Sequence, residues 1–231
     1  MFKENNDTSF EINLGHFDTD FKTKVSADFD TRYIKPKYHH VPPERYAKYA
    51  RAEDLAKVTD LSDGSRMFAI INGSFIFGDY IEALAVTYDL GIKEMTISTL
   101  SFSENNVDSL ANLMNGGYLD HLNVIVSDYF FSHERNNLIR YAYKELDIDN
   151  RFQLSVAATH CKMTIFEIDD GRKVVIHGSA NLRSSGNIEQ ICIEVNSDLY
   201  SFNFEYQQKI IEEYKSIDKS VRYNNLWDTI T

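Results

Sequence analysis

The chain has little of what marks a membrane-spanning, exported or disulfide-stabilised protein. No run of roughly eighteen apolar residues occurs anywhere in its 231 residues, so no transmembrane helix is predicted. The N-terminal stretch MFKENNDTSF is polar and contains no apolar signal core. Cysteine is scarce, with Cys161 and Cys192 alone, which does not indicate disulfide stapling. These absences favour a reducing compartment and a cytoplasmic location.

Acidic residues outnumber basic ones, with 35 Asp and Glu against 24 Lys and Arg, so the net charge is −11. An acidic chain does not indicate non-specific nucleic-acid binding. The segment 31–51 departs from this balance, with six Lys or Arg residues, four tyrosines, all three prolines of the chain and Glu44 as its one acid. Such a segment is suited to neutralising phosphates and stacking on bases, but it could equally be a solvated linker or a strap on a dimer mate. It is expected to enter a short helix near Pro43.

The middle of the chain alternates between strand and helix patterns. The apolar run 67–71 is typical of a buried strand, and 80–90 has helical periodicity. Further strands are expected at 95–100, 122–127 and 152–159, and helices at 103–113 and 132–146. This order implies a parallel sheet with right-handed crossovers. One more strand at 191–195 and a helix at 199–217 are expected to follow.

Polar residues then recur at a spacing of two. On a strand, His160 and Lys162 would share one face, and Cys161 would share the opposite, apolar face with Met163. Asp-Gly at 170–171 predicts a hairpin to the run that ends at Gly178, which itself would allow close backbone approach.

The same spacing returns in Ser179 and Asn181, and again in Asn187 and Glu189. Lysine, hydroxyl and amide groups suit phosphate oxygens, and a histidine beside a lysine can attack phosphorus if a carboxylate such as Glu189 fixes its tautomer. His177 has the parity of Ser179, so it either lines the pocket or makes a buried hydrogen bond. No cluster of cysteines or carboxylates suggests a metal, so the positive side chains would have to stabilise the transition-state charge.

These fragments resemble the signature of the phospholipase D superfamily, which reads His-x-Lys, a later acid, Gly-Ser-x-Asn and then Asn-x-Glu. The matching positions are His160, Lys162, Gly178, Ser179, Asn181, Asn187 and Glu189. Glu167 stands where the family usually has aspartate, and its role is left open. The resemblance implies an α/β fold in which a mixed sheet lies between two layers of helices, that is, an α/β/α sandwich. We expect this domain at 51–217, with an arm and basic linker at 1–50 and a tail at 218–231.

The resemblance also implies the chemistry. His160, Lys162, Ser179, Asn181 and Glu189 would be catalytic, and Gly178, Asn187 and His177 would contact substrate, without cofactor or metal. One histidine becomes a phosphohistidine and a second protonates the leaving oxygen. Because no second His-x-Lys occurs in the chain, a two-fold homodimer would have to supply the second histidine.

The expected activity is that of a metal-independent phosphodiesterase, with nucleic acid as the favoured substrate because single-motif relatives of this size are often nucleases. Two alternatives stay open. One is a hydrolase of phospholipids or small diesters, which the acidic balance favours. The other is a non-catalytic dimeric module that keeps the fold for binding or assembly.

Overall fold

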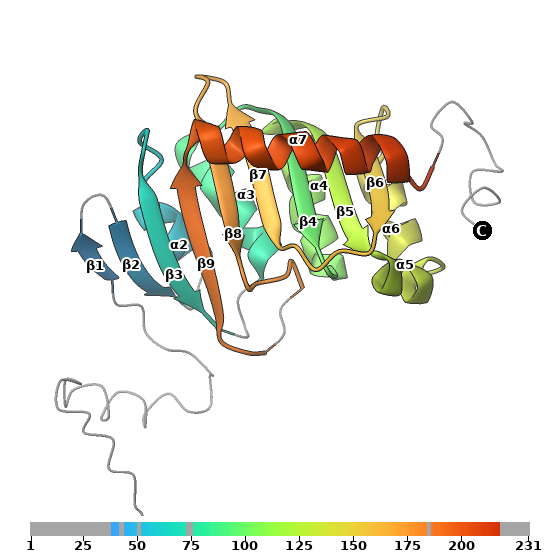
Figure 1. The fold of residues 1–231 in the computed structure, drawn as a ribbon, viewed down its shortest axis with the longest axis horizontal. Coiled ribbons are helices and arrows are strands. Elements are labelled where there is room, and N and C mark those ends of the chain that lie inside the picture. The colour runs from blue at the N-terminus through green and yellow to red at the C-terminus, as the bar shows by residue number, and fades with distance from the viewer. Residues whose placement is uncertain (1–37, 42–43, 50–51, 73–75, 184–185, 218–231) are drawn as a thin grey trace, which may run out of the picture. The chain divides into compact units, whose positions relative to one another are not determined.

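The computed structural model describes residues 38–41, 44–49, 52–72, 76–183 and 186–217 (Figure 1). The expected arm at 1–37 and the tail at 218–231 lie outside these residues, so their predicted roles stay predictions. All described residues fall within one compact unit.

Nine strands and six helices make up the described part of the chain. The strands are β1 (Tyr38–Val41), β2 (Glu44–Tyr49), β3 (Arg66–Ile71), β4 (Ile92–Thr99), β5 (Leu119–Ser127), β6 (Phe152–Ala157), β7 (Met163–Ile168), β8 (Lys173–Gly178) and β9 (Glu189–Val195). The helices are α2 (Ala52–Val58), α3 (Phe77–Tyr88), α4 (Glu104–Asn115), α5 (Asp128–Glu134), α6 (Leu138–Leu146) and α7 (Ser197–Tyr214).

The strands form one mixed sheet in the order β1-β2-β3-β9-β8-β7-β4-β5-β6. The pairs β4–β5 and β5–β6 are parallel, as expected from the strand–helix alternation. However, β3 is not next to β4, because the antiparallel run β9-β8-β7 is inserted between them. The expected α/β fold with a mixed sheet is confirmed, and the inserted strands are those that flank the motif.

Helices cover the two faces of the sheet unequally. Apolar side chains of α2, α3, α4 and α6 pack with those of β3, β4, β5 and β9 in one large core. On the other face α7 crosses β8, β7, β4, β5 and β6 (Figure 1). The apolar cluster beneath it is small, comprising Ile165, Val175 and Tyr200 with Met163 and Leu199 at its border. Buried polar contacts contribute there too, such as that from Gln207 to the Ser98 hydroxyl at 3.1 Å.

The helix limits follow from local capping. At the start of α4, the Asn106 side chain accepts a hydrogen bond from the Ser103 backbone N–H at 2.9 Å, and Gly116 ends the helix. The Asn196 side chain accepts from the backbone N–H groups of Asp198 and Leu199 at the start of α7. The sequence predicted α4 from its capping residues and α7 from its periodicity, and the observed limits of both helices differ from the predicted ones by only a few residues.

Two of the helix predictions were wrong. The helix expected near Pro43 is instead the strand β2, whose backbone pairs in parallel with β3. An unpaired edge of β3 would expose a row of backbone donors and acceptors, which a neighbouring strand satisfies. The helix expected over 132–146 is divided into α5 and α6.

Neither Cys161 nor Cys192 forms a disulfide. Among the helices of the described residues, none combines the length and apolar character needed to cross a membrane.

Candidate active site

The motif residues gather at one edge of the sheet. The parallel strands β3, β4, β5 and β6 end at this edge, β8 ends there too, and β7 and β9 begin there. The register shows this directly, because Met163 lies opposite both Ser98 and His177, and Glu189 lies opposite Ile71. The carboxyl ends of parallel strands are the usual location of sites in α/β sheets.

His160 and Lys162 lie in the connection that precedes β7, not on the strand itself. His160 is exposed, and Lys162 is half-buried with its Nζ donating to the His160 carbonyl oxygen at 3.2 Å. The prediction that Cys161 packs in the apolar core was wrong, because its side chain is exposed. The Cys161 backbone N–H bonds to the Thr159 hydroxyl at 3.1 Å, so the chain turns here before strand alternation begins.

Gly178 is the last residue of β8, and the next residue, Ser179, is hydrogen-bonded to the start of β9. The Ser179 N–H donates to the Gln190 carbonyl oxygen at 2.9 Å, and the Gln190 N–H donates to the Ser179 hydroxyl at 3.0 Å. The Ser179 hydroxyl in turn donates to the Glu189 carboxylate. A Cβ at position 178 would lie 2.1 Å from the Gln190 carbonyl oxygen, so this close approach requires glycine.

Asn181 is held against the segment that follows β4. Its side-chain oxygen accepts a hydrogen bond from the Leu100 N–H at 3.1 Å. The next residue is also fixed, because the Leu182 N–H donates to the Thr99 hydroxyl at 3.1 Å. Within the described part of the chain, the Asn181 amide nitrogen has no hydrogen-bond acceptor, so it can donate to a ligand.

The remaining predicted residues are distributed unevenly. Asn187 is exposed just before β9, two residues ahead of Glu189. Glu167 lies near the opposite end of β7, where its carboxylate is 3.8 Å from Lys173 Nζ, so it does not join the site. The predicted contact of Glu189 with His160 is not made within the described residues, where Glu189 contacts Ser179 instead. Its orienting role therefore stays a prediction.

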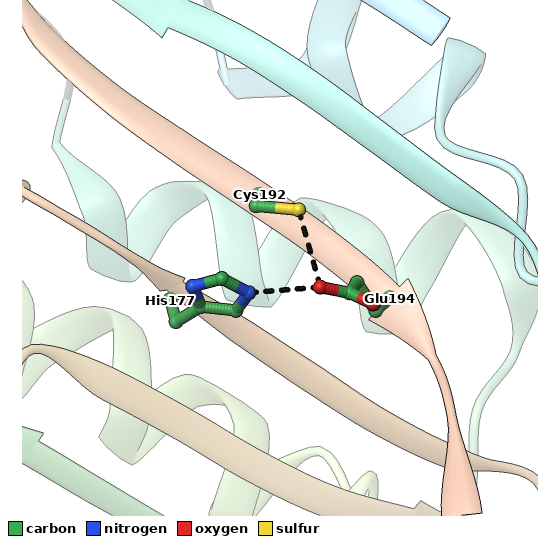
Figure 2. Close-up of side chains that lie close together, drawn as sticks. All are labelled: His177, Cys192 and Glu194. Carbon is green, nitrogen blue, oxygen red and sulfur yellow. Dashed lines mark hydrogen bonds and ion pairs between the residues drawn. The ribbon is translucent and has the colours of Figure 1, made fainter. Parts of the chain in front are cut away.

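His177 makes a hydrogen bond to a residue that the sequence did not single out (Figure 2). Its Nε2 lies 3.0 Å from Glu194 Oε1, and Cys192 Sγ lies 3.6 Å from the same oxygen. Arg66 donates from Nε and Nη2 to the other oxygen, Oε2, at 2.9 Å each. Burial raises the pKa of the Glu194 carboxyl, but hydrogen bonds from His177 and Arg66 outweigh burial and hold this pKa below its usual value.

A surface hollow of about 730 Å³ borders the 181–183 segment. It is lined by Ser103, Glu104, Asn105, Glu134, Asn137, Leu138 and Arg183. Arg183 is the cation of this lining, and its backbone N–H is fixed to the Ser101 carbonyl oxygen at 3.2 Å. Sequence reasoning missed Arg183 and the 99–101 segment, because neither belongs to the motif, and residues 99 and 182 are joined only by the fold.

Comparison with known proteins gives structural neighbours only. No family model and no curated protein matches the chain. NucT from Helicobacter pylori aligns over 65% of this chain and 99% of its own, at 16% identity and a TM-score of 0.46. Nuc from Salmonella typhimurium, a phospholipase D family member, aligns over 65% and 97%, at 15% identity and a TM-score of 0.43. Yeast tyrosyl-DNA phosphodiesterase aligns over 64% and 40%, at 13% identity and a TM-score of 0.39.

Proposed function

We propose that this chain is a metal-independent phosphodiesterase that cleaves nucleic acid through a phosphohistidine, in a homodimer that shares one cleft between two copies of the site. The observation that carries the proposal is the gathering of three separate motif fragments at one sheet edge. An imidazole, an ammonium, an amide nitrogen and a carboxylate there are groups suited to phosphoryl transfer.

In the proposed reaction, a ring nitrogen of His160 attacks phosphorus. A P–N bond forms as the P–O bond to the leaving group breaks, and His160 of the partner subunit gives a proton to the departing oxygen. Water then attacks phosphorus and gives its proton to that same second histidine, and the P–N bond breaks. Lys162 and the Asn181 amide nitrogen would stabilise the charge on the non-bridging oxygens.

The first experiment measures hydrolysis of bis(p-nitrophenyl) phosphate and of labelled DNA in excess chelator. His160→Ala and Lys162→Ala should each lower turnover by roughly a hundredfold or more. His121→Ala and Lys93→Ala are matched controls, since both side chains are exposed at the strand ends furthest from the motif, and both should retain activity. Activity that disappears with chelator, or that persists in His160→Ala, would contradict the mechanism.

The shared cleft has its own test. Wild-type chains are refolded or co-expressed with increasing amounts of His160→Ala chains. If each dimer needs both histidines, activity per total protein falls as the square of the wild-type fraction, because mixed dimers are inactive. A linear fall would mean that each chain works alone.

A small-diester hydrolase and a non-catalytic module make different predictions. The basic segment 31–51 supports a nuclease, and salt-dependent DNA binding that disappears on its removal would support that substrate. Turnover of the aryl diester without DNA cleavage would favour a small-diester hydrolase. A folded dimer that turns over neither substrate would leave a binding or assembly module.

A further inference from the structure

A second group of reactive side chains lies on the face of the sheet that α7 covers. It is one residue pair further into the sheet than the Gly178–Ile191 pair beside the motif. His177 on β8 lies directly opposite Cys192 on β9, and Glu194 follows two residues along β9. Because alternate residues of a strand share a face, all three side chains project from the same side. Cys192 and Glu194 are two residues apart on β9, and His177 lies opposite Cys192 on β8. Their side chains therefore meet above one face of the sheet (Figure 2).

The ligand atoms of this triangle are close enough for a single ion. His177 nitrogen, Cys192 Sγ and a Glu194 carboxylate oxygen all lie within 4.8 Å of one another. Zinc bonds of about 2.0–2.3 Å in a tetrahedron place neighbouring ligand atoms roughly 3.3–3.5 Å apart. The observed separations from Glu194 Oε1 are 3.0 Å to the histidine nitrogen and 3.6 Å to the sulfur. Small side-chain rotations would therefore suffice to bind a metal.

Arg66 holds the carboxylate in the orientation that such a site needs. It is opposite Glu194 on β3 and binds Oε2 through two nitrogens, so Oε1 is left to face the histidine and the cysteine. A partner that fixes a ligand from behind is typical of metal sites. Glu194 and Cys192 are almost fully buried, whereas 35% of the His177 side chain is exposed and offers an approach from solvent.

We propose that His177, Cys192 and Glu194 bind a zinc-like divalent transition-metal ion, with a fourth position open to water. A thiolate and an imidazole favour such an ion over magnesium or calcium, which prefer oxygen ligands alone. On binding, the thiol proton leaves to solvent and the imidazole keeps its proton on Nδ1, so that Nε2 can coordinate the ion. The ion's two positive charges are then offset by the thiolate and the carboxylate.

The proposed ion would join β8 to β9 just before both strands reach the motif. His177 immediately precedes Gly178, and the pair Gly178–Ile191 is the next rung toward Ser179 and Glu189. The ion is thus a structural clamp and takes no part in bond breaking. The inference does not rest on the proposed function, since none of its ligands contacts phosphorus in that mechanism.

The test measures metal directly on the full chain. Protein purified with zinc in the medium should contain about one zinc per chain. After chelation under reducing conditions, added Co²⁺ should produce a thiolate-to-cobalt charge-transfer band that saturates at about one equivalent. Returning Zn²⁺ should raise the unfolding temperature by several degrees, because it binds the folded state alone.

Variants separate this site from adventitious binding. Cys192→Ser and His177→Ala should each abolish the cobalt band and the thermal shift. Cys161→Ser is the matched control, because it removes the other, exposed cysteine and should leave both signals intact. If the Cys192→Ser variant fails to fold because this side chain is buried, the His177→Ala variant, at a partly exposed position, still tests the site. A metal-free wild type with no response to Zn²⁺, or equal loss of signal in Cys161→Ser, would overturn the proposal.

Discussion

Ser179 donates its hydroxyl proton to the Glu189 carboxylate across the gap between β8 and β9. The same hydroxyl oxygen accepts the Gln190 N–H, so the serine connects the Gly-Ser-x-Asn fragment to the Asn-x-Glu fragment. Two parts of the motif that are separated in sequence therefore form one hydrogen-bonded unit.

Removal of the Ser179 hydroxyl should reduce catalysis far more than stability. In Ser179→Ala we expect diester hydrolysis to fall by up to about a hundredfold, because the Glu189 carboxylate, which is proposed to orient the histidine, loses the hydroxyl that holds it. The unfolding free energy should change little because the pair is exposed. Ser201→Ala removes a similarly exposed hydroxyl on α7 and should alter neither quantity. A Ser179→Ala enzyme with wild-type turnover would refute a catalytic role.

Asn181 should show separable contributions to folding and to catalysis. Asn181→Ala leaves the Leu100 N–H without its acceptor, which should cost about 1–3 kcal/mol of unfolding free energy in denaturant titrations. Asn181→Asp keeps the acceptor oxygen, so its stability should stay near that of the wild type. Both variants lose the amide nitrogen and should lose activity. An active Asn181→Asp enzyme would exclude the amide as a phosphate ligand.

Gly178 should tolerate no side chain. In Gly178→Ala the new Cβ would lie 2.1 Å from a backbone oxygen, which cannot move without shifting β9. Strain and overpacking together should cost at least about 3 kcal/mol by chemical denaturation. Gly171→Ala is the control, because its φ of +88° is also unfavourable for alanine but no atom lies within 4 Å of the new Cβ. It should cost only about 1–2 kcal/mol.

The Glu194 carboxyl should make stability depend on pH in acid. Its pKa is lower in the folded chain than the ordinary value of 4.5, so the folded state binds a proton less readily than the unfolded state. The stabilisation is therefore present above pH 4.5 and is lost as the pH falls through the folded pKa. In metal-free buffer, Glu194→Gln should flatten this part of the curve of unfolding temperature against pH. An unchanged acid limb in Glu194→Gln would contradict this assignment.

Arg183 should distinguish long substrates from short ones. It lines the hollow beside the 181–183 segment, where a chain continuing from the scissile phosphate could lie. Arg183→Ala should weaken DNA binding and reduce the salt dependence of the binding constant, because one phosphate contact is lost. Hydrolysis of the aryl diester should be unaffected. Arg135→Ala is the control. Arg135 lies next to Glu134, which lines the hollow, but Arg135 itself does not line it.

The amino-acid sequence was sufficient to predict the α/β class and most helices and strands. It was also sufficient to suggest the catalytic hypothesis. Hydrophobic periodicity specifies which segments are strands or helices because each must bury one face. The hairpin between β7 and β8 followed from Asp170-Gly171, and the pairing is observed. The three motif fragments were recognisable because their spacing is local, within about thirty residues.

Only the tertiary structure decided which distant segments meet. Pairing of β3 with β9, the strand formed by 44–49, and the docking of Asn181 on Leu100 depend on contacts between residues far apart in sequence. The sequence did not reveal the group formed by His177, Cys192 and Glu194, because the register of β8 against β9 is what brings His177 beside the other two. Local patterns encode the elements, whereas long-range backbone pairing places their side chains beside one another.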